Sequence, residues 1–279
     1  MLKQRIITAL LLLAVLLPTL FYPHIAPFGV FSLLLIASAG WEWAQLNGCR
    51  AGTSLLLGAG LGGALLLFWW AGGLAPNWRA LWLVLGGAWV LLAVVMLARG
   101  VAGWGAWPAV LRLSCGLLLL ACAWLALVQA RQVGLEFLLS VLTLVWMADI
   151  AAYAGGKAMG RRKLAPSVSP GKTWEGAISG AVGVLVLASV WVWADAQGWG
   201  GHGSLYARLW SLGALFTLIG LAFLASMSVV GDLVESLVKR SAGAKDSSQL
   251  LPGHGGVLDR IDALLPVLPL SMMFVTLIP

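Results

Sequence analysis

The sequence predicts an all-α, polytopic integral membrane protein with about nine transmembrane helices. Hydrophobic residues make up 61% of the 279 residues and charged residues only 10%, whereas a soluble domain is nearer half apolar and a quarter charged. Apolar stretches repeatedly approach the length of about 20 residues that a helix needs to cross a bilayer. The sixteen tryptophans are typical of belts at the membrane–water interfaces.

Nine apolar stretches define the expected helices, and polar or charged segments separate them. They are centred near residues 6–22, 28–46, 54–72, 80–98, 109–128, 135–155, 176–194, 209–231 and 263–278. Lys3 and Arg5 precede the first stretch, as in a signal peptide, but no small-residue cleavage site follows it. We therefore expect the first stretch to be an uncleaved helix.

The lysines and arginines set the expected orientation. With the N-terminus in the cytoplasm, thirteen of them fall in cytoplasmic segments and three, Arg79, Arg131 and Arg208, in outer segments. The positive-inside rule predicts this asymmetry, and removing one middle helix would destroy it. We expect a bacterial-type inner (plasma) membrane protein with a cytoplasmic N-terminus and cytoplasmic polar loops. The net charge of +7 then reflects loops facing anionic lipid, with no nucleic acid implied.

The chain falls into two regions, before and after about residue 135, that differ in how many polar residues they carry. Residues 1–134 contain one carboxylate, Glu42, and are expected to form a scaffold of transmembrane helices. Glycines such as Gly58 are expected to allow close contact between these helices. Residues 135–279 carry polar groups in and beside the membrane and are expected to form the catalytic region, with its chemistry at the cytoplasmic interface.

The eighth apolar stretch continues as a helix with one polar face. Residues at steps of three or four share that face; these are Ser228, Asp232, Ser236 and Lys239 or Arg240. A carboxylate such as Asp232 in apolar surroundings needs a cation or a basic partner. One interpretation is an ion pair with Lys239 or Arg240 along the helix. The other is a metal site, with Asp259 supplying a second oxygen.

A second polar cluster runs from residue 149 to residue 176. Asp149 and Tyr153 are one helical turn apart, a strip of basic residues follows, and Lys172 precedes the next apolar stretch. The run Gly171-Lys172-Thr173 is not a P-loop, because Pro166 stands where the first glycine of that motif belongs. A helix N-terminus beside Lys172 could still bind phosphate. The alternative is a basic loop that only orients the protein.

The loop of residues 236–262 combines cations, carboxylates and the turn Pro-Gly-His-Gly-Gly at residues 252–256. Such a combination suits a metal-bound phosphoanhydride, because glycines let the backbone approach a ligand. The alternative is a solvated cytoplasmic loop that helps to orient the protein, but such a loop would not need the Pro-Gly-His-Gly-Gly turn. His254 is the one histidine expected to be functional, since His24 and His202 lie in short outer loops.

These motifs resemble the phosphatidate cytidylyltransferases, also called CDP-diacylglycerol synthases. The family signature has the form S-x-x-K-R-x4-K-D, a short spacer, and P-G-H-G-G-x-x-D-R-x-D. The chain supplies, in this order and spacing, Ser236, Lys239, Arg240, Lys245, Asp246, Pro252, Gly253, His254, Gly255, Gly256, Asp259, Arg260 and Asp262. Residues 149–176 also resemble the family pattern. Many members carry Lys at the position of Gly171, so no side-chain role is expected there.

The resemblance implies transfer of a cytidylyl group from CTP to phosphatidic acid. It implies Mg²⁺ held by Asp232 and Asp259, a second, monovalent cation such as K⁺, and Ser236 and Lys239 as catalytic neighbours. Substrate binding is expected at Arg240, Lys245, Asp246, His254, Gly255, Gly256, Arg260, Asp262, Lys172, Tyr153 and Asp149. The expected partners are CTP, phosphatidic acid and membrane lipids, with a homodimer left open.

Other functions fit the sequence less well. A CDP-alcohol phosphatidyltransferase needs an aspartate-rich helix, and a soluble cytidylyltransferase needs an H-x-G-H turn; the chain has neither. Cys49, Cys115 and Cys122 form no C-x-x-C pair, so no zinc site is expected. The remaining alternative is a membrane transporter with an ion site at Asp149 and Asp232, but neither polar cluster has a second copy.

Overall fold

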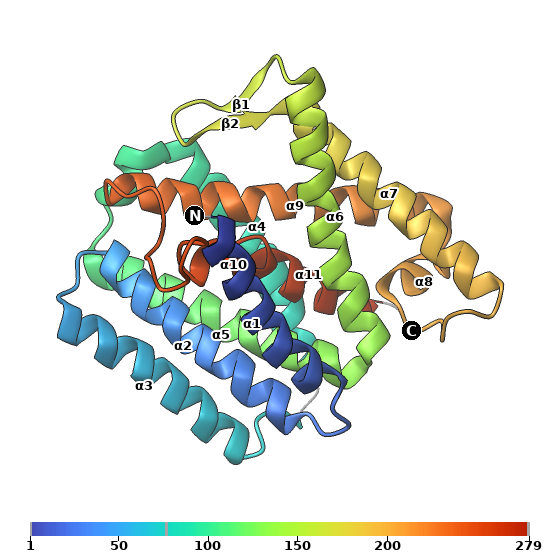
Figure 1. The fold of residues 1–279 in the computed structure, drawn as a ribbon, viewed down its shortest axis with the longest axis horizontal. Helices are drawn as coiled ribbons and strands as arrows, with labels where there is room; N and C mark the ends of the chain where they lie inside the picture. The colour runs from blue at the N-terminus through green and yellow to red at the C-terminus, as the bar shows by residue number, and fades with distance from the viewer. Residues whose placement is uncertain (1, 76–77, 278–279) are drawn as a thin grey trace.

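The computed structural model describes residues 2–75 and 78–277, and it is built mainly from helices (Figure 1). The elements in order are α1 Leu2–Phe21, α2 Ala26–Leu46, α3 Ala51–Trp70, α4 Arg79–Gly105, α5 Ala109–Val133, α6 Leu135–Met159, β1 Lys163–Ala165, β2 Ser169–Thr173, α7 Trp174–Ala196, α8 Leu205–Trp210, α9 Ala214–Ser241, α10 Leu258–Ile261 and α11 Leu264–Leu277. Among the described residues, eight helical segments are long and apolar enough to cross a membrane, and Ile6–Phe21 is a shorter apolar one. The predicted all-α, polytopic fold is therefore confirmed. Residue 278 of the last expected helix lies outside the described residues.

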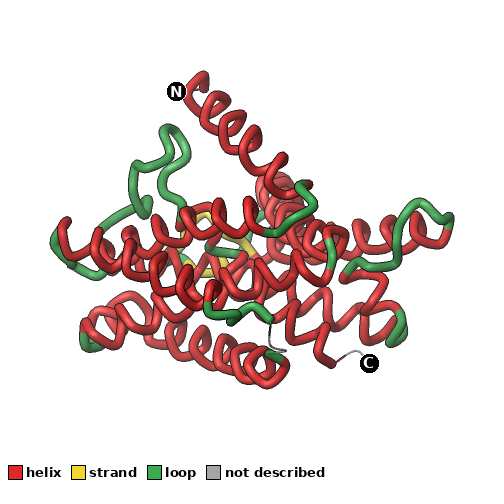
Figure 2. The backbone as a smooth tube through the Cα atoms, turned by 90° about the horizontal axis from the view of Figure 1, so that it is seen from below, coloured by secondary structure: helices red, strands yellow, loops and turns green. Residues whose placement is uncertain are grey.

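The helices pack in pairs around a shared core. α6 lies along α7 and α2 along α3, while α9 contacts α4, α7 and α11 near the middle of the molecule (Figure 1). Figure 2 shows α1 projecting from the bundle. It contacts α2 and the loop that follows α9, where the Thr8 hydroxyl donates to the carbonyl of Pro252 at 3.0 Å, and Arg131 of α5 donates to the carbonyl of Leu20 at 3.0 Å.

Two features differ from the sequence expectation. The eighth stretch, expected at residues 209–231, is split into short α8 and long α9 by Gly213, whose φ of 104° ends the helical geometry. α9 then continues beyond residue 231 to Ser241, as expected for the helical face that carries Asp232, Ser236 and Lys239. A small antiparallel hairpin, β1–β2, pairs Lys163 with Thr173. Strands of three and five residues are too short to leave a readable alternation in the sequence.

Packing between the helices accounts for some of the glycines and tryptophans in the sequence. Gly58 lets α3 touch α2, because a Cβ atom there would lie 2.6 Å from the carbonyl oxygen of Ala37. This is the close helix contact that the sequence predicts. Some tryptophans serve the core instead of an interfacial belt, since Trp82, Trp89 and Trp124 are almost completely buried. The Trp82 indole donates to Gln129 at 3.1 Å, which satisfies its N–H inside the bundle.

Glu42 of α2 joins the N-terminal helices to the loop between α9 and α10. Its side chain is fully buried. Its carboxylate accepts hydrogen bonds from the hydroxyls of Ser247 and Ser248 and from the backbone N–H groups of Val257 and Leu258, at 2.6 to 3.1 Å. Four donors satisfy a charge that would otherwise be costly to bury. The loop is therefore fixed by a residue more than 200 positions earlier in the chain.

We expect Glu42→Gln to loosen this loop. A glutamine amide presents NH₂ where the carboxylate accepts hydrogen bonds, and bonds to a charged group contribute about 1.5–3 kcal/mol each. The thermal midpoint of the purified protein should fall, and trypsin should cleave faster at Lys245, which is exposed in this loop. Ser38→Ala is the control, because that hydroxyl bonds within α2 to Leu34. Equal protease resistance in both variants would contradict this role for Glu42.

Candidate active site

A cavity of about 480 Å³ lies where α6, α7, β2 and α9 meet. Four of the predicted site residues line it: Asp149 and Tyr153 from α6, Lys172 from β2 and Asp232 from α9. Asp149 is close enough to Lys172 and Asp232 to interact with both electrostatically. The two polar clusters predicted from distant parts of the sequence therefore share one site.

The hairpin and the start of α7 place Lys172 in this cavity. Thr173 caps α7, because its hydroxyl accepts from the N–H of Gly176 at 3.1 Å, and the chain changes from strand to helix there. The Lys172 ammonium reaches α9 and lies 2.7 Å from the Asp232 carboxylate. The other Asp232 oxygen accepts from the Ser236 hydroxyl at 3.1 Å. Asp232 thus pairs with β2, and among the described residues it has no ion pair along α9, so the alternative of a pair with Lys239 or Arg240 is wrong.

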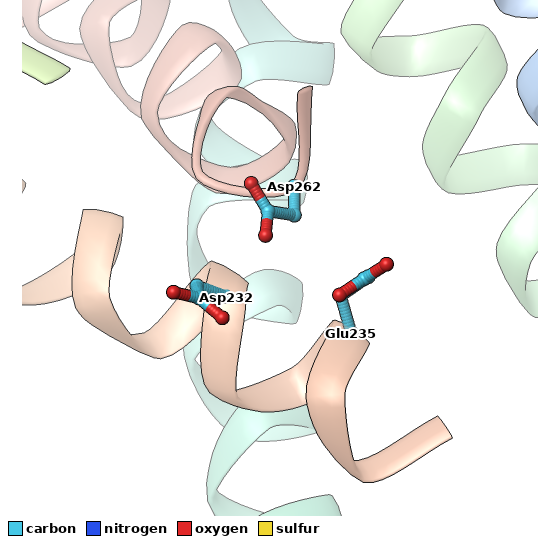
Figure 3. A group of neighbouring side chains, drawn as sticks. All are labelled: Asp232, Glu235 and Asp262. Carbon is cyan, nitrogen blue, oxygen red and sulfur yellow. The ribbon is translucent and has the colours of Figure 1, made fainter. Parts of the chain in front are cut away.

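Asp232 belongs to a group of three carboxylates. Asp232 and Glu235 come from α9 and Asp262 from the segment between α10 and α11, and the three side chains point toward one another (Figure 3). Each offers one oxygen, and these oxygens all lie within 4.8 Å of one another. Close packing makes this possible, because a Cβ atom on Gly231 would lie 2.5 Å from the carbonyl oxygen of Asp262.

Asp259 lies beside this group and is held by Lys239. The Lys239 ammonium bonds to one Asp259 oxygen at 2.6 Å and also pairs with Glu235. The other Asp259 oxygen accepts from the N–H and the hydroxyl of Ser247 and from the N–H of Gly256, at 2.8 to 3.0 Å. A side chain at position 256 would collide with Ser247, which explains this glycine of the Pro-Gly-His-Gly-Gly turn.

The donor set suits a hard divalent cation. Carboxylate oxygens are the protein ligands that Mg²⁺ prefers. Glu235 is 2% exposed, and its Oε1 atom accepts no hydrogen bond from any described residue. A buried carboxylate oxygen without a donor is costly unless a cation is nearby. Asp232, Glu235 and Asp262 therefore fit a Mg²⁺ ion.

The other predicted residues lie around the loop after α9. Arg240, Lys245, Asp246 and Arg260 are exposed. Arg260 donates to the carbonyl of His254, and Gly255 has a φ of 82°, which closes the turn beside Asp259. These residues do not line the cavity of α6, α7, β2 and α9, so their substrate contacts remain predictions.

Sequence reasoning missed Glu235, Ser247 and the role of Glu42. Glu235 follows Asp232 by three residues and precedes Lys239 by four, a spacing that could have placed it in the cluster. Glu42 is an acid inside an apolar stretch, which is itself a signal of function. Its partners in the distant loop leave no mark in the sequence.

The chain is similar to known proteins over most of its length. The model of the cytidylyltransferase family matches residues 3–278. The phosphatidate cytidylyltransferase of Pseudomonas aeruginosa is 43% identical over 275 residues, covering 96% of this chain and 95% of that protein. The enzyme of the same name from Haemophilus influenzae is 36% identical over 295 residues, covering 98% of each chain. The one from Bacillus subtilis is 41% identical over 138 residues, which is 50% of this chain and 46% of that protein.

The matches cover nearly the whole chain, including the helices before residue 135 for which the sequence motifs gave no indication. This integral membrane protein therefore belongs to the cytidylyltransferase family.

Proposed function

We propose that this chain transfers the cytidylyl group of CTP to phosphatidic acid, giving CDP-diacylglycerol and pyrophosphate, in the cavity lined by Lys172 and Asp232. The observation that supports this most directly is the meeting of the two polar clusters in one cavity of about 480 Å³. Its apolar lining, which includes Leu164 and Val229, suits a lipid substrate, and its charged lining suits phosphates. Relatives named for this activity match the whole chain.

The reaction needs charge neutralisation more than proton transfer. The phosphate of phosphatidic acid is already an anion at neutral pH, so it can attack the α-phosphorus of CTP without a general base. Two polyanions must then approach each other, which fixed cations favour. Lys172 and Lys157 line the cavity, and the N-terminus of α7 begins beside Lys172. We assign these groups to the substrate phosphates.

We propose that Mg²⁺ is held by Asp232 together with Glu235 and Asp262. When bound, the ion would neutralise phosphate charge and help to orient the two substrates. Asp259 remains a predicted ligand, which requires Lys239 to release one of its oxygens. The four carboxylates and two lysines leave two negative charges, which one Mg²⁺ balances. The second, monovalent cation that we propose would be balanced by the phosphates of the substrates.

The position of the label in CTP tests the proposed reaction. Purified protein with phosphatidic acid, Mg²⁺ and CTP labelled at the α-phosphate should move label into the lipid phase, whereas CTP labelled at the γ-phosphate should leave it in water as pyrophosphate. Omission of phosphatidic acid is the control and should abolish the lipid label. Lipid labelling from the γ-phosphate would indicate a lipid kinase, and labelling from neither would leave the transporter alternative.

We expect the carboxylate cluster to set the Mg²⁺ requirement. Asp232→Asn and Asp262→Asn each remove a charged oxygen ligand, so turnover should fall by about 100-fold or more, and more Mg²⁺ should be needed for the remaining activity. Lys172→Ala is the matched control, because it removes a partner of Asp232 and no ligand. It should weaken CTP binding without raising the Mg²⁺ requirement.

Asp259→Asn separates the two candidate metal arrangements. Asp259→Asn could raise the Mg²⁺ requirement while Asp232→Asn and Asp262→Asn leave it unchanged. In that case Asp259 holds the ion, and its assignment to the three-carboxylate cluster is wrong. Size-exclusion profiles that match the parent protein would show that each variant is folded.

We also propose that the cavity faces the cytoplasm and that the membrane is the bacterial inner membrane. Gln249 is exposed in the loop after α9, and Ser211 is exposed before α9 begins. In a chain without native cysteines, Gln249→Cys should react with a membrane-impermeant thiol reagent only from the cytoplasmic side, and Ser211→Cys only from the outer side. Ser247 is unsuitable as a reporter because it is buried. Labelling of Gln249→Cys from outside intact cells would reverse the proposed topology.

A further inference from the structure

A second pair of acids lies at the far ends of α6 and α7, away from the cavity of Lys172 and Asp232. Glu136 is in the first turn of α6 and Asp195 in the last turn of α7. Asp195 is only 3% exposed, and neither of its carboxylate oxygens has a hydrogen-bond partner among the described residues. A buried carboxylate in this condition is costly and needs a compensating group.

Glu136 is oriented toward the same place. One of its oxygens accepts from the N–H of Gly203 at 3.0 Å, and the other lies 3.4 Å from the indole nitrogen of Trp191. Together with Asp195, Glu136 lines a cavity of about 430 Å³. The ion pairs between described residues include neither acid.

Gly200 shows how closely the two carboxylates converge. A Cβ atom built on it would lie 1.8 Å from Asp195 Oδ1 and 3.2 Å from Glu136 Oε1. Oxygens from both acids thus lie close to the same point, and glycine at this position leaves room for the Asp195 carboxylate. Both acids line the cavity, where water can supply further oxygen ligands.

Two carboxylates at such a distance repel each other, and burial of Asp195 increases the cost. His202, which is exposed on the loop, and the hydroxyl of Ser204 interact with Asp195, but His202 lies outside the cavity lining. A hard divalent cation bound between the two carboxylates would neutralise both.

We propose that Asp195 and Glu136 bind a divalent cation of the Ca²⁺ or Mg²⁺ type. The ion would hold the loop of residues 197–204 against α6 and α7. The far end of that loop is already fixed, because the N–H of Leu205 donates to Ser140 at 2.8 Å. The cation would fix the near end, at the face opposite the proposed reaction.

Luminescence of terbium(III), an oxygen-binding substitute for Ca²⁺, tests this site in the full chain in lipid nanodiscs. Trp199 lines the cavity and can transfer excitation to a bound terbium ion. The test uses an Asp232→Asn, Asp262→Asn background, so that the other acid cluster does not contribute. Excitation of tryptophan should give terbium emission that Ca²⁺ displaces. Adding Asp195→Asn or Glu136→Gln should weaken terbium binding by at least about tenfold.

Trp199→Phe provides a second measurement that does not touch a ligand. Its side chain is 75% exposed, so the substitution should leave the fold intact. If the ion lies in this cavity, Trp199→Phe should dim the emission without changing the terbium affinity. Absence of emission in the background chain would overturn the proposal. So would terbium affinity unchanged by both Asp195→Asn and Glu136→Gln in folded protein.

Discussion

The concentration of negative charge around Lys239 is the constraint on which the rest of the structure depends. Glu235 and Asp259 both bond to this one ammonium group, and Asp232 and Asp262 complete a cluster with Glu235. Each carboxylate costs free energy to place near apolar helices unless donors or cations surround it. Lys172 and the N–H groups of the loop after α9 supply those donors, so hairpin, loop and helix are all positioned by the same charges.

Glu42 extends this dependence to the first half of the chain. It accepts four hydrogen bonds from the loop that also holds Asp259, and Ser247 bonds to both acids. A loop rich in glycine would be mobile if left to its own contacts. The helices before residue 135 therefore do more than form a scaffold, because α2 fixes the loop after α9 that orients Asp259.

The sequence predicted those features that depend on local pattern and failed where distant residues meet. Apolar length and charge asymmetry predicted the helices, and family motifs predicted that Asp232 and Lys172 would matter. The pairing of Lys172 with Asp232 depends on how the β1–β2 hairpin meets α9. The convergence of Asp232 with Glu235 and Asp262 depends on how the segment between α10 and α11 packs against α9. The hairpin was missed because its strands are short, and Glu42 because its partners lie more than 200 residues away.

The length of α9 suits the proposed location of the chemistry at the membrane edge. At about 1.5 Å per residue, its 28 residues extend about 42 Å, whereas the hydrocarbon core is about 30 Å thick. If the helix enters the core near Ala214, Asp232 falls near the opposite boundary, and Glu235 and Lys239 lie beyond it. A lipid phosphate resides at that depth, and a nucleotide can reach it from water. One overlong helix can therefore carry both the segment that spans the bilayer and the carboxylates that face the phosphates.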